Sequence, residues 1–215
     1  MGFIGQRICQ AILSIDRLGV GQTVSEVTSH KAGLVEFCIE RSKEKLHFQK
    51  VDYKAFEHDM MQYKPMVFLD GTAREAYDKI ELPERKTKYS CGYDVRTPVP
   101  ILIAPGCSVV VPTGIKVVMS EDEMETWCLK LYARSGIGIK DKVVITNSVG
   151  LIDGDFQFSD NDGDMLIALT NMSGETKRYD AGTRICQAVF EIYGKTSNDK
   201  ASGKRSGGVG STGQE

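Results

Sequence analysis

The sequence predicts a mainly β domain behind a small helical extension, and three observations support this fold class. From about residue 66 onward, short runs rich in Val and Ile are bounded by Gly, Pro, Asn or Asp, as in strands joined by turns. No helical period between these runs is long enough for the crossovers of a parallel sheet. Before about residue 64, apolar residues instead recur at three- and four-residue steps. We therefore expect an all-β barrel or jelly roll that follows a helical segment.

Three amphipathic patterns predict the helices of the N-terminal segment. The first puts isoleucines on one helix face, at Ile4, Ile8, Ile12 and Ile15. The second spans 31–46. The third places apolar side chains at Tyr53, Phe56, Met60 and Tyr63. It should end before Pro65, because proline disfavours a helical conformation in the preceding residue.

These patterns divide the chain into three regions. We assign 1–64 to a helical extension, 65–195 to the β domain and 196–215 to a tail rich in Gly, Ser and Lys, which composition alone predicts to be flexible. The extension has a spacing similar to a helix–turn–helix unit, but its charges nearly balance. A helical cap, an oligomer contact or a surface for an unknown partner is therefore the simpler interpretation.

The overall composition limits the partners and the compartment. The formal net charge of −2 gives no general attraction to nucleic acid or to an anionic membrane, so we expect neither a membrane nor a stable nucleic-acid partner. No stretch approaches the roughly 18–20 apolar residues that span a bilayer, and no secretion signal is evident. The six cysteines contain no C-x-x-C pair and suit reduced, packed thiols. We expect a cytoplasmic protein, in the host cytoplasm if the source is viral.

The histidines restrict the chemistry of the β domain. His30, His47 and His58 all lie in the first 64 residues. We therefore expect no Ser-His-Asp or Cys-His catalytic unit and no His-ligated zinc in the β domain. A catalytic base there must be a carboxylate or a metal-bound hydroxide.

Five short segments carry the polar residues and glycines that suggest a site. They are 92–98 (GYDVRTP), 133–140 (ARSGIGIK), 147–156 (NSVGLIDGDF), 182–190 (GTRICQAVF) and 207–213 (GGVGSTG). In order and approximate spacing they resemble the motifs of the homotrimeric dUTPase family. The resemblance implies a dUTPase-like jelly roll that hydrolyses dUTP to dUMP and pyrophosphate with Mg²⁺. It also implies a homotrimer whose active sites combine neighbouring subunits, with the tail donated across an interface.

The second and fourth segments suit phosphate binding. Arg134 offers a planar fork of donors, Ser135 adds a hydroxyl, and Gly136 lets the backbone approach a ligand closely. The resemblance implies that Gln187 contacts a phosphate. It also implies that Asp94 supports the water shell of the metal or the neighbouring phosphate motif, and Mg²⁺ suits such indirect binding because it retains several waters.

The third segment contains the expected base and the nucleoside contacts. Asn147 can present both an acceptor and donors to a pyrimidine edge. The resemblance implies that uracil is read by Asn147 and by the backbone around Gly150, Leu151 and Ile152. It makes Asp153 the general base that activates the attacking water.

An aromatic residue closes the same segment. Phe156 stands where the family usually has Tyr, and its ring is expected to pack against the deoxyribose and exclude a 2′-hydroxyl.

The tail motif suits a loop that closes over phosphates. Gly210, Ser211 and Thr212 offer backbone N–H and hydroxyl donors, and Arg205, or alternatively Lys204, supplies a cation. Val209 stands where the family has a Phe that stacks on uracil, so closure is expected to be weaker, since stacking contributes about 1–3 kcal/mol. The segment 159–164 lengthens the loop after Phe156 beyond the family pattern and is expected to form an extended hairpin tip.

Two other functions stay open at this point. In the related dCTP deaminases a catalytic Glu lies three residues before the Asn that ends the strand after the 159–164 segment. That Asn is Asn171 in this sequence, and the position three residues before it is Ala168. A nucleotide-binding regulatory or partner-binding module is also compatible with the extra N-terminal segment. The match at Arg134, Ser135 and Asp153 favours an active hydrolase.

Overall fold

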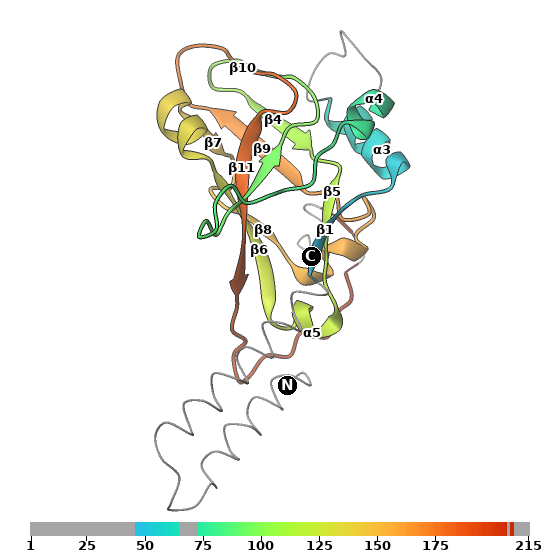
Figure 1. Cartoon of the computed structure of the whole chain (residues 1–215). Coiled ribbons are helices and arrows are strands. Elements are labelled where there is room, and N and C mark those ends of the chain that lie inside the picture. Colours follow the sequence, from blue (N-terminus) through green and yellow to red (C-terminus); the bar gives the residue numbers. More distant parts are fainter. Residues whose placement is uncertain (1–45, 65–72, 206, 209–215) are drawn as a thin grey trace, which may run out of the picture.

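The structure is a computed structural model that describes residues 46–64, 73–205 and 207–208 (Figure 1). The helices expected within 1–45 lie outside these residues, as do Val209, Gly210, Ser211 and Thr212 of the tail motif. Within the described ranges, no helix has the length and apolar character needed to cross a membrane.

The larger strand group has the order β2–β11–β6–β8. Its members are β2 (Tyr93–Arg96), β11 (Arg184–Ile192), β6 (Trp127–Ala133) and β8 (Gly150–Ile152). A second group has the order β4–β9–β7, formed by β4 (Ser108–Pro112), β9 (Leu166–Asn171) and β7 (Val143–Ile145). Two further pairs join β1 (His47–Lys50) to β5 (Ile115–Val118) and β10 (Lys177–Tyr179) to β3 (Ile101–Ile103). Every one of these pairings is antiparallel, and the predicted mainly β fold is confirmed.

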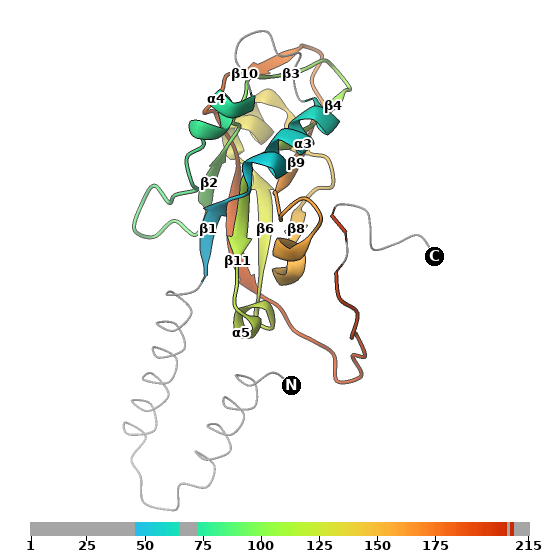
Figure 2. The same ribbon diagram turned by 90° about the vertical axis from the view of Figure 1, so that its right-hand side faces the viewer.

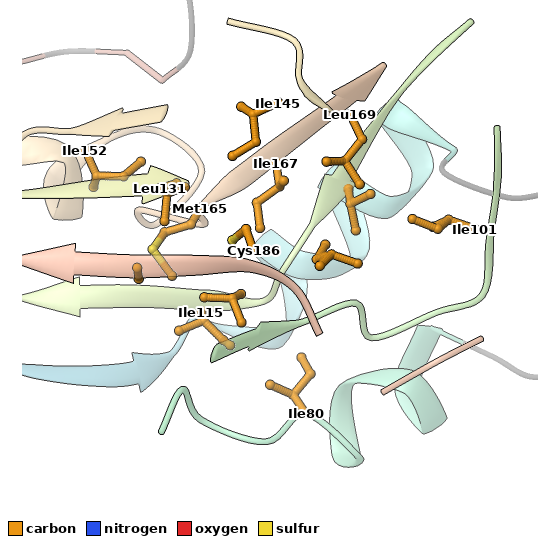
Figure 3. Close-up of a cluster of buried hydrophobic side chains, with 14 of the residues drawn as sticks. Ile80, Ile101, Ile115, Leu131, Ile145, Ile152, Met165, Ile167, Leu169 and Cys186 are labelled. Carbon is orange, nitrogen blue, oxygen red and sulfur yellow. The ribbon is translucent and has the colours of Figure 1, made fainter. Parts of the chain in front are cut away.

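The core forms where side chains of the two larger groups meet. In β9 the residues alternate between buried and partly buried, so that Ile167 and Leu169 point inward. They join Leu131 of β6 and Ile115 of β5 in one apolar cluster (Figure 3). Alternation with a period of two therefore fixes which face of each strand is covered.

Short helices connect these strands. They are α3 (Tyr53–Tyr63), α4 (Ala73–Asp78), α5 (Glu121–Met124), the π-helix η1 (Gly136–Asp141) and the 3₁₀ helix η2 (Gly154–Phe158). Helix α5 begins with a capping box, in which the Glu123 carboxylate accepts hydrogen bonds from the backbone N–H and the hydroxyl of Ser120. This helix matters for the site because it packs against η2, which follows Asp153.

Helix α3 agrees with the third N-terminal pattern. It begins after Asp52, whose side chain accepts the backbone N–H of Lys54, and it ends at Lys64 in a left-handed conformation. Its apolar face is formed by Phe56 and Met60, which are 0% and 1% exposed in the core cluster.

The segment before this helix differs from the helical prediction. His47–Lys50 forms strand β1, which pairs with β5 along its whole length. Val51 is also buried in the common core. The described part of the predicted extension, residues 46–64, is therefore packed as part of the β domain.

The 159–164 segment is tied to α3 and to the β4–β5 turn. Asp162 accepts the backbone N–H of Asp52 at 2.7 Å and pairs with Lys116 at 2.7 Å. Asn161 donates to Asp59 of α3 at 3.1 Å. The expected extended hairpin tip is instead a set of turns that holds α3 against the domain.

Asp164 ends this segment as a buried carboxyl group. Its Oδ1 accepts the backbone N–H groups of Thr113 and Gly114, while Oδ2 has no hydrogen-bond partner among the described residues. Burial and the negative charge of nearby Asp59 raise the pKa of Asp164 to about 8. The native protein therefore holds a proton here that the unfolded chain releases at much lower pH.

Stability should fall as the pH rises toward 8 because of this proton. A carboxyl group with a raised native pKa stabilises the fold most below its unfolded pKa and loses this contribution as the pH passes its native pKa. Asp164→Asn, which does not titrate, should show a smaller loss of melting temperature between pH 6 and pH 9 than the unmodified protein. Thermal unfolding across this range measures the difference, with Asp160→Asn at an exposed neighbour as the control. Equal slopes for Asp164→Asn and the unmodified protein would contradict this assignment.

Candidate active site

A pocket of about 280 Å³ is bounded by strands of both larger groups and by the tail. Its lining includes Asn147, the segment 150–153, Phe156 and Arg205. These are all of the third-segment residues that the sequence predicts, together with the cation of the tail. We call this site the Asp153 pocket.

A sharp turn after β7 places Asn147 at the Asp153 pocket. The N–H of Ser148 donates to the carbonyl of Ile145 at 2.9 Å, and Ser148 adopts a left-handed φ of 67°. Gly150 then begins β8 so close to β6 that an added Cβ would lie 3.1 Å from the Cβ of Leu131. The glycine thus lets the backbone of β8 form one wall of the pocket.

Asp153 lies where β8 ends and η2 begins. Its side chain is 52% exposed, so the carboxylate is open to water and to a ligand. The following residue must be small, because a Cβ on Gly154 would come within 2.7 Å of the Met124 backbone in α5. Packing of η2 on α5 therefore fixes the backbone immediately after Asp153.

Arg205 of the tail contacts the same acidic site. Its Nη2 donates to Asp153 at 2.6 Å and its Nε donates to Asp155 at 2.8 Å. The guanidinium carbon lies 5.4 Å from the centre of the Phe156 ring, within cation–π range. The sequence predicts that Arg205 binds a phosphate, whereas in this structure it pairs with two carboxylates.

A second polar group, the Asp94 cluster, is formed by Asp94, Arg134, Arg184 and Gln187. Arg184 donates to Asp94 Oδ2 at 3.0 Å, and Nε of Arg134 lies 3.4 Å from Oδ1. Gln187 also donates to Oδ1, at 3.4 Å. Asp94 is only 4% exposed, so its carboxylate interacts with these donors rather than with water and aligns them.

The phosphate-binding candidates lie apart from the pocket. Arg134 is partly exposed, and Ser135 and Gly136 are exposed where η1 begins. Neither these three residues nor Gln187 line the Asp153 pocket. In the described part of one chain, these four predicted phosphate contacts therefore lie outside the pocket that holds the predicted nucleoside contacts and Arg205.

The donor set does not form a cage for a metal ion. Among the described residues, no three His, Cys, Asp or Glu side chains are grouped so that they could hold one. Asp94 is surrounded by Arg134, Arg184 and Gln187 rather than by further carboxylates. Its contacts align the two arginines, and the indirect role of Asp94 through the water shell of Mg²⁺ stays a prediction.

The position at which dCTP deaminases have a catalytic Glu also lies in the pocket. Ala168 of β9 is one of the lining residues. A methyl group at this place cannot activate water by proton transfer. The pocket therefore lacks the glutamate that deamination would need there.

Sequence reasoning missed two residues of this site. Asp155 follows the predicted base by two positions and anchors Arg205, a role that the DGD sequence alone does not reveal. Tyr63 of α3 lines the pocket although it lies far from every motif. Only the packing of α3 on the domain brings this ring to the site.

Comparisons with known proteins agree with the motifs. A family model described as dUTPase matches residues 78–213. The deoxyuridine 5'-triphosphate nucleotidohydrolase of Lactococcus lactis subsp. lactis (strain IL1403) is 36% identical over 137 residues, which make up 62% of this chain and 89% of that protein. The protein of the same name from Actinobacillus pleuropneumoniae serotype 3 (strain JL03) is 34% identical over 162 residues, or 72% of this chain and 100% of that protein.

A solved structure gives the same assignment. The dUTPase from Streptococcus mutans superposes with a TM-score of 0.50 at 35% identity, covering 54% of this chain and 89% of that chain. The resemblance found in the sequence is thereby confirmed in both sequence and fold. The chain belongs to the dUTPase family.

Proposed function

We propose that the chain hydrolyses dUTP to dUMP and pyrophosphate, with Asp153 as the general base. The observation that carries this proposal is the position of Asp153, which is half exposed in the pocket that also contains Asn147 and Phe156. A water held by the carboxylate attacks the α-phosphorus and gives its proton to Asp153. The bond from the α-phosphorus to the bridging oxygen breaks, and pyrophosphate leaves.

The same pocket suits recognition of a deoxyuridine. Asn147 offers an amide to the polar edge of the base, and the backbone of 150–152 lies beside it. The ring of Phe156, which is 5% exposed, presents an apolar wall to the sugar. A 2′-hydroxyl against this wall would lose its hydrogen bonds to water, which disfavours ribonucleotides.

The triphosphate contacts come from a neighbouring subunit in this proposal. Arg134, Ser135 and Gln187 lie outside the Asp153 pocket, so a single chain does not surround the substrate. A homotrimer joins the Asp94 cluster of one subunit to the pocket of the next. The buried Asp94 holds Arg134 and Arg184 in place, so their donors are already oriented when charge develops on the phosphates.

Mg²⁺ belongs to the substrate in this account. Bound with the triphosphate, Mg²⁺ would supply positive charge that offsets the negative charge of the phosphates. The residues of this chain then need only hold the phosphate oxygens, which suits the cationic Arg134 better than a ring of carboxylates.

Arg205 has two sets of contacts in the catalytic cycle. Its ion pair with Asp153 engages Oδ2, one of the two oxygens that could accept the proton, so Arg205 competes with the attacking water for this carboxylate. Its second contact, to Asp155, can remain and hold the tail at the pocket. Asp155 is thus a positioning residue that acts through Arg205.

Product analysis with dUTP, dCTP, dTTP and UTP tests the proposed reaction. The protein with Mg²⁺ should release dUMP and pyrophosphate from dUTP alone. Asp153→Asn should lower kcat by about 10²–10⁴-fold, since this is the usual contribution of a general base. Asp180→Asn, at a carboxylate whose side chain is 79% exposed, should keep full activity as the matched control.

Other products would overturn this function in distinct ways. Release of dUTP from dCTP would identify a deaminase in spite of Ala168. Binding of dUTP without any turnover would favour a nucleotide-binding module.

A double-mutant cycle tests the role of Asp155. Arg205→Gln and Asp155→Asn should each raise the KM for dUTP about fivefold or more, because each removes a charge-assisted hydrogen bond that holds the tail. The double variant should be no worse than Arg205→Gln alone, since both changes break one interaction. Steady-state kinetics at two salt concentrations measure this. Additive effects would show that Asp155 acts independently of Arg205.

A further inference from the structure

Tyr63 supplies a second aromatic wall to the Asp153 pocket. It is the last residue of α3 and lines the pocket together with Phe156 and Gly208 of the tail. Figure 2 shows α3, the η2 segment and the tail on the same side of the molecule. Tyr63 precedes residue 78, where the family match begins, so no family motif assigns it a role.

The ring is uncharged at neutral pH. Burial raises the pKa of Tyr63 above its ordinary value, and the negative charges of Asp59, Asp160 and Asp164 raise it further. A neutral phenol does not repel an anionic nucleotide. The pocket is therefore lined by a second aromatic side chain that is uncharged, in addition to Phe156.

The polar contacts of α3 hold Tyr63 in this place. Asp59 precedes it by four residues and so lies on the same helix face. Asp59 is 2% exposed and accepts a hydrogen bond from Asn161, which also donates to the carbonyl of Asp164 at 3.1 Å. The 159–164 segment thus fixes the end of the helix that carries the ring.

The same segment also contacts the tail. A Cβ on Gly208 would come within 2.9 Å of the Asp160 carboxylate, so the tail backbone passes directly over the segment. Tyr63 and Gly208 therefore line the pocket, and the 159–164 segment contacts both the helix and the tail that carry them.

We propose that Tyr63 contacts the nucleoside part of the bound nucleotide through its ring, and that Asn161 positions it through Asp59. The proposal rests on the proposed function, because it takes a deoxyuridine nucleotide as the occupant of the pocket. Stacking or edge contact with the base or sugar needs the aromatic ring but not the hydroxyl group.

Two substitutions at one position separate this role from a structural one. Tyr63→Phe keeps the ring, whereas Tyr63→Leu keeps apolar packing and removes the aromatic face. Tyr63→Leu should raise both the KM for dUTP and the Kd for dUMP about tenfold, corresponding to the loss of one stacking contact. Tyr63→Phe should stay within about twofold of the unmodified protein, because apolar contact is retained. Tyr89→Leu, at a tyrosine that is 88% exposed, is the control.

Asn161→Ala tests the positioning step. It should raise the Kd for dUMP in the presence of Tyr63 but have no further effect in the Tyr63→Leu background. Calorimetric titration with dUMP gives a readout that does not depend on turnover, and melting temperatures report whether each variant folds.

The outcomes distinguish this inference from the hydrolase assignment. If the unmodified protein cleaves dUTP and Tyr63→Leu binds dUMP as tightly as Tyr63→Phe, the role of Tyr63 is wrong and the function stands. If the unmodified protein neither cleaves dUTP nor binds dUMP, both proposals fail. Weaker dUMP binding by Tyr63→Leu alone, at an unchanged melting temperature, supports the proposal even if turnover is slow.

Discussion

The register of β11 between β2 and β6 is the constraint on which the site depends. β11 pairs with β6 from Cys186↔Ala133 to Ile192↔Trp127, and on its other edge it places Gln187 opposite Asp94. The pairing with β6 sets the position of Arg134, which directly follows the end of β6. The pairing with β2 brings Asp94 close to Arg184 and Gln187. Through β6 the same register places β8, and with it the peptide that ends at Asp153. A slip of one residue would turn each of these side chains to the opposite face, so the Asp94 cluster and the Asp153 pocket are positioned by a single set of backbone hydrogen bonds.

The sequence predicts the parts of this arrangement that are local. Strand runs, turn glycines and the 147–156 motif depend on neighbouring residues, and the structure places Asn147, Asp153 and Phe156 of that motif in one pocket. The helix at 53–63 also follows from its own spacing of apolar residues. Gly150 and Gly154 are recognisable as motif glycines, although only the packing against Leu131 and Met124 explains why they must be glycine.

Contacts between distant parts of the chain could not be predicted in this way. His47–Lys50 has no strong strand pattern, and its pairing with β5 across the domain decides its conformation. Asn161 and Asp59 are 102 residues apart, and no local signal links the 159–164 segment to α3. The contacts of Arg205 with Asp153 and Asp155 likewise depend on where the tail crosses the pocket. These are tertiary contacts. A single sequence shows which residues are present, but it does not show which distant residues lie close together in the fold.

We propose that one chain provides the base and the nucleoside pocket while another provides the phosphate donors. Mixed assemblies of Asp153→Asn chains and Arg134→Ala chains, purified through a different tag on each, test this directly. Each variant alone should be inactive toward dUTP. In a shared site, some pockets of the mixed assembly combine an intact Asp153 from one chain with an intact Arg134 from another, so activity should return. If the mixed assemblies form but remain as inactive as the two variants alone, both groups act within one chain and the account of a shared active site is contradicted.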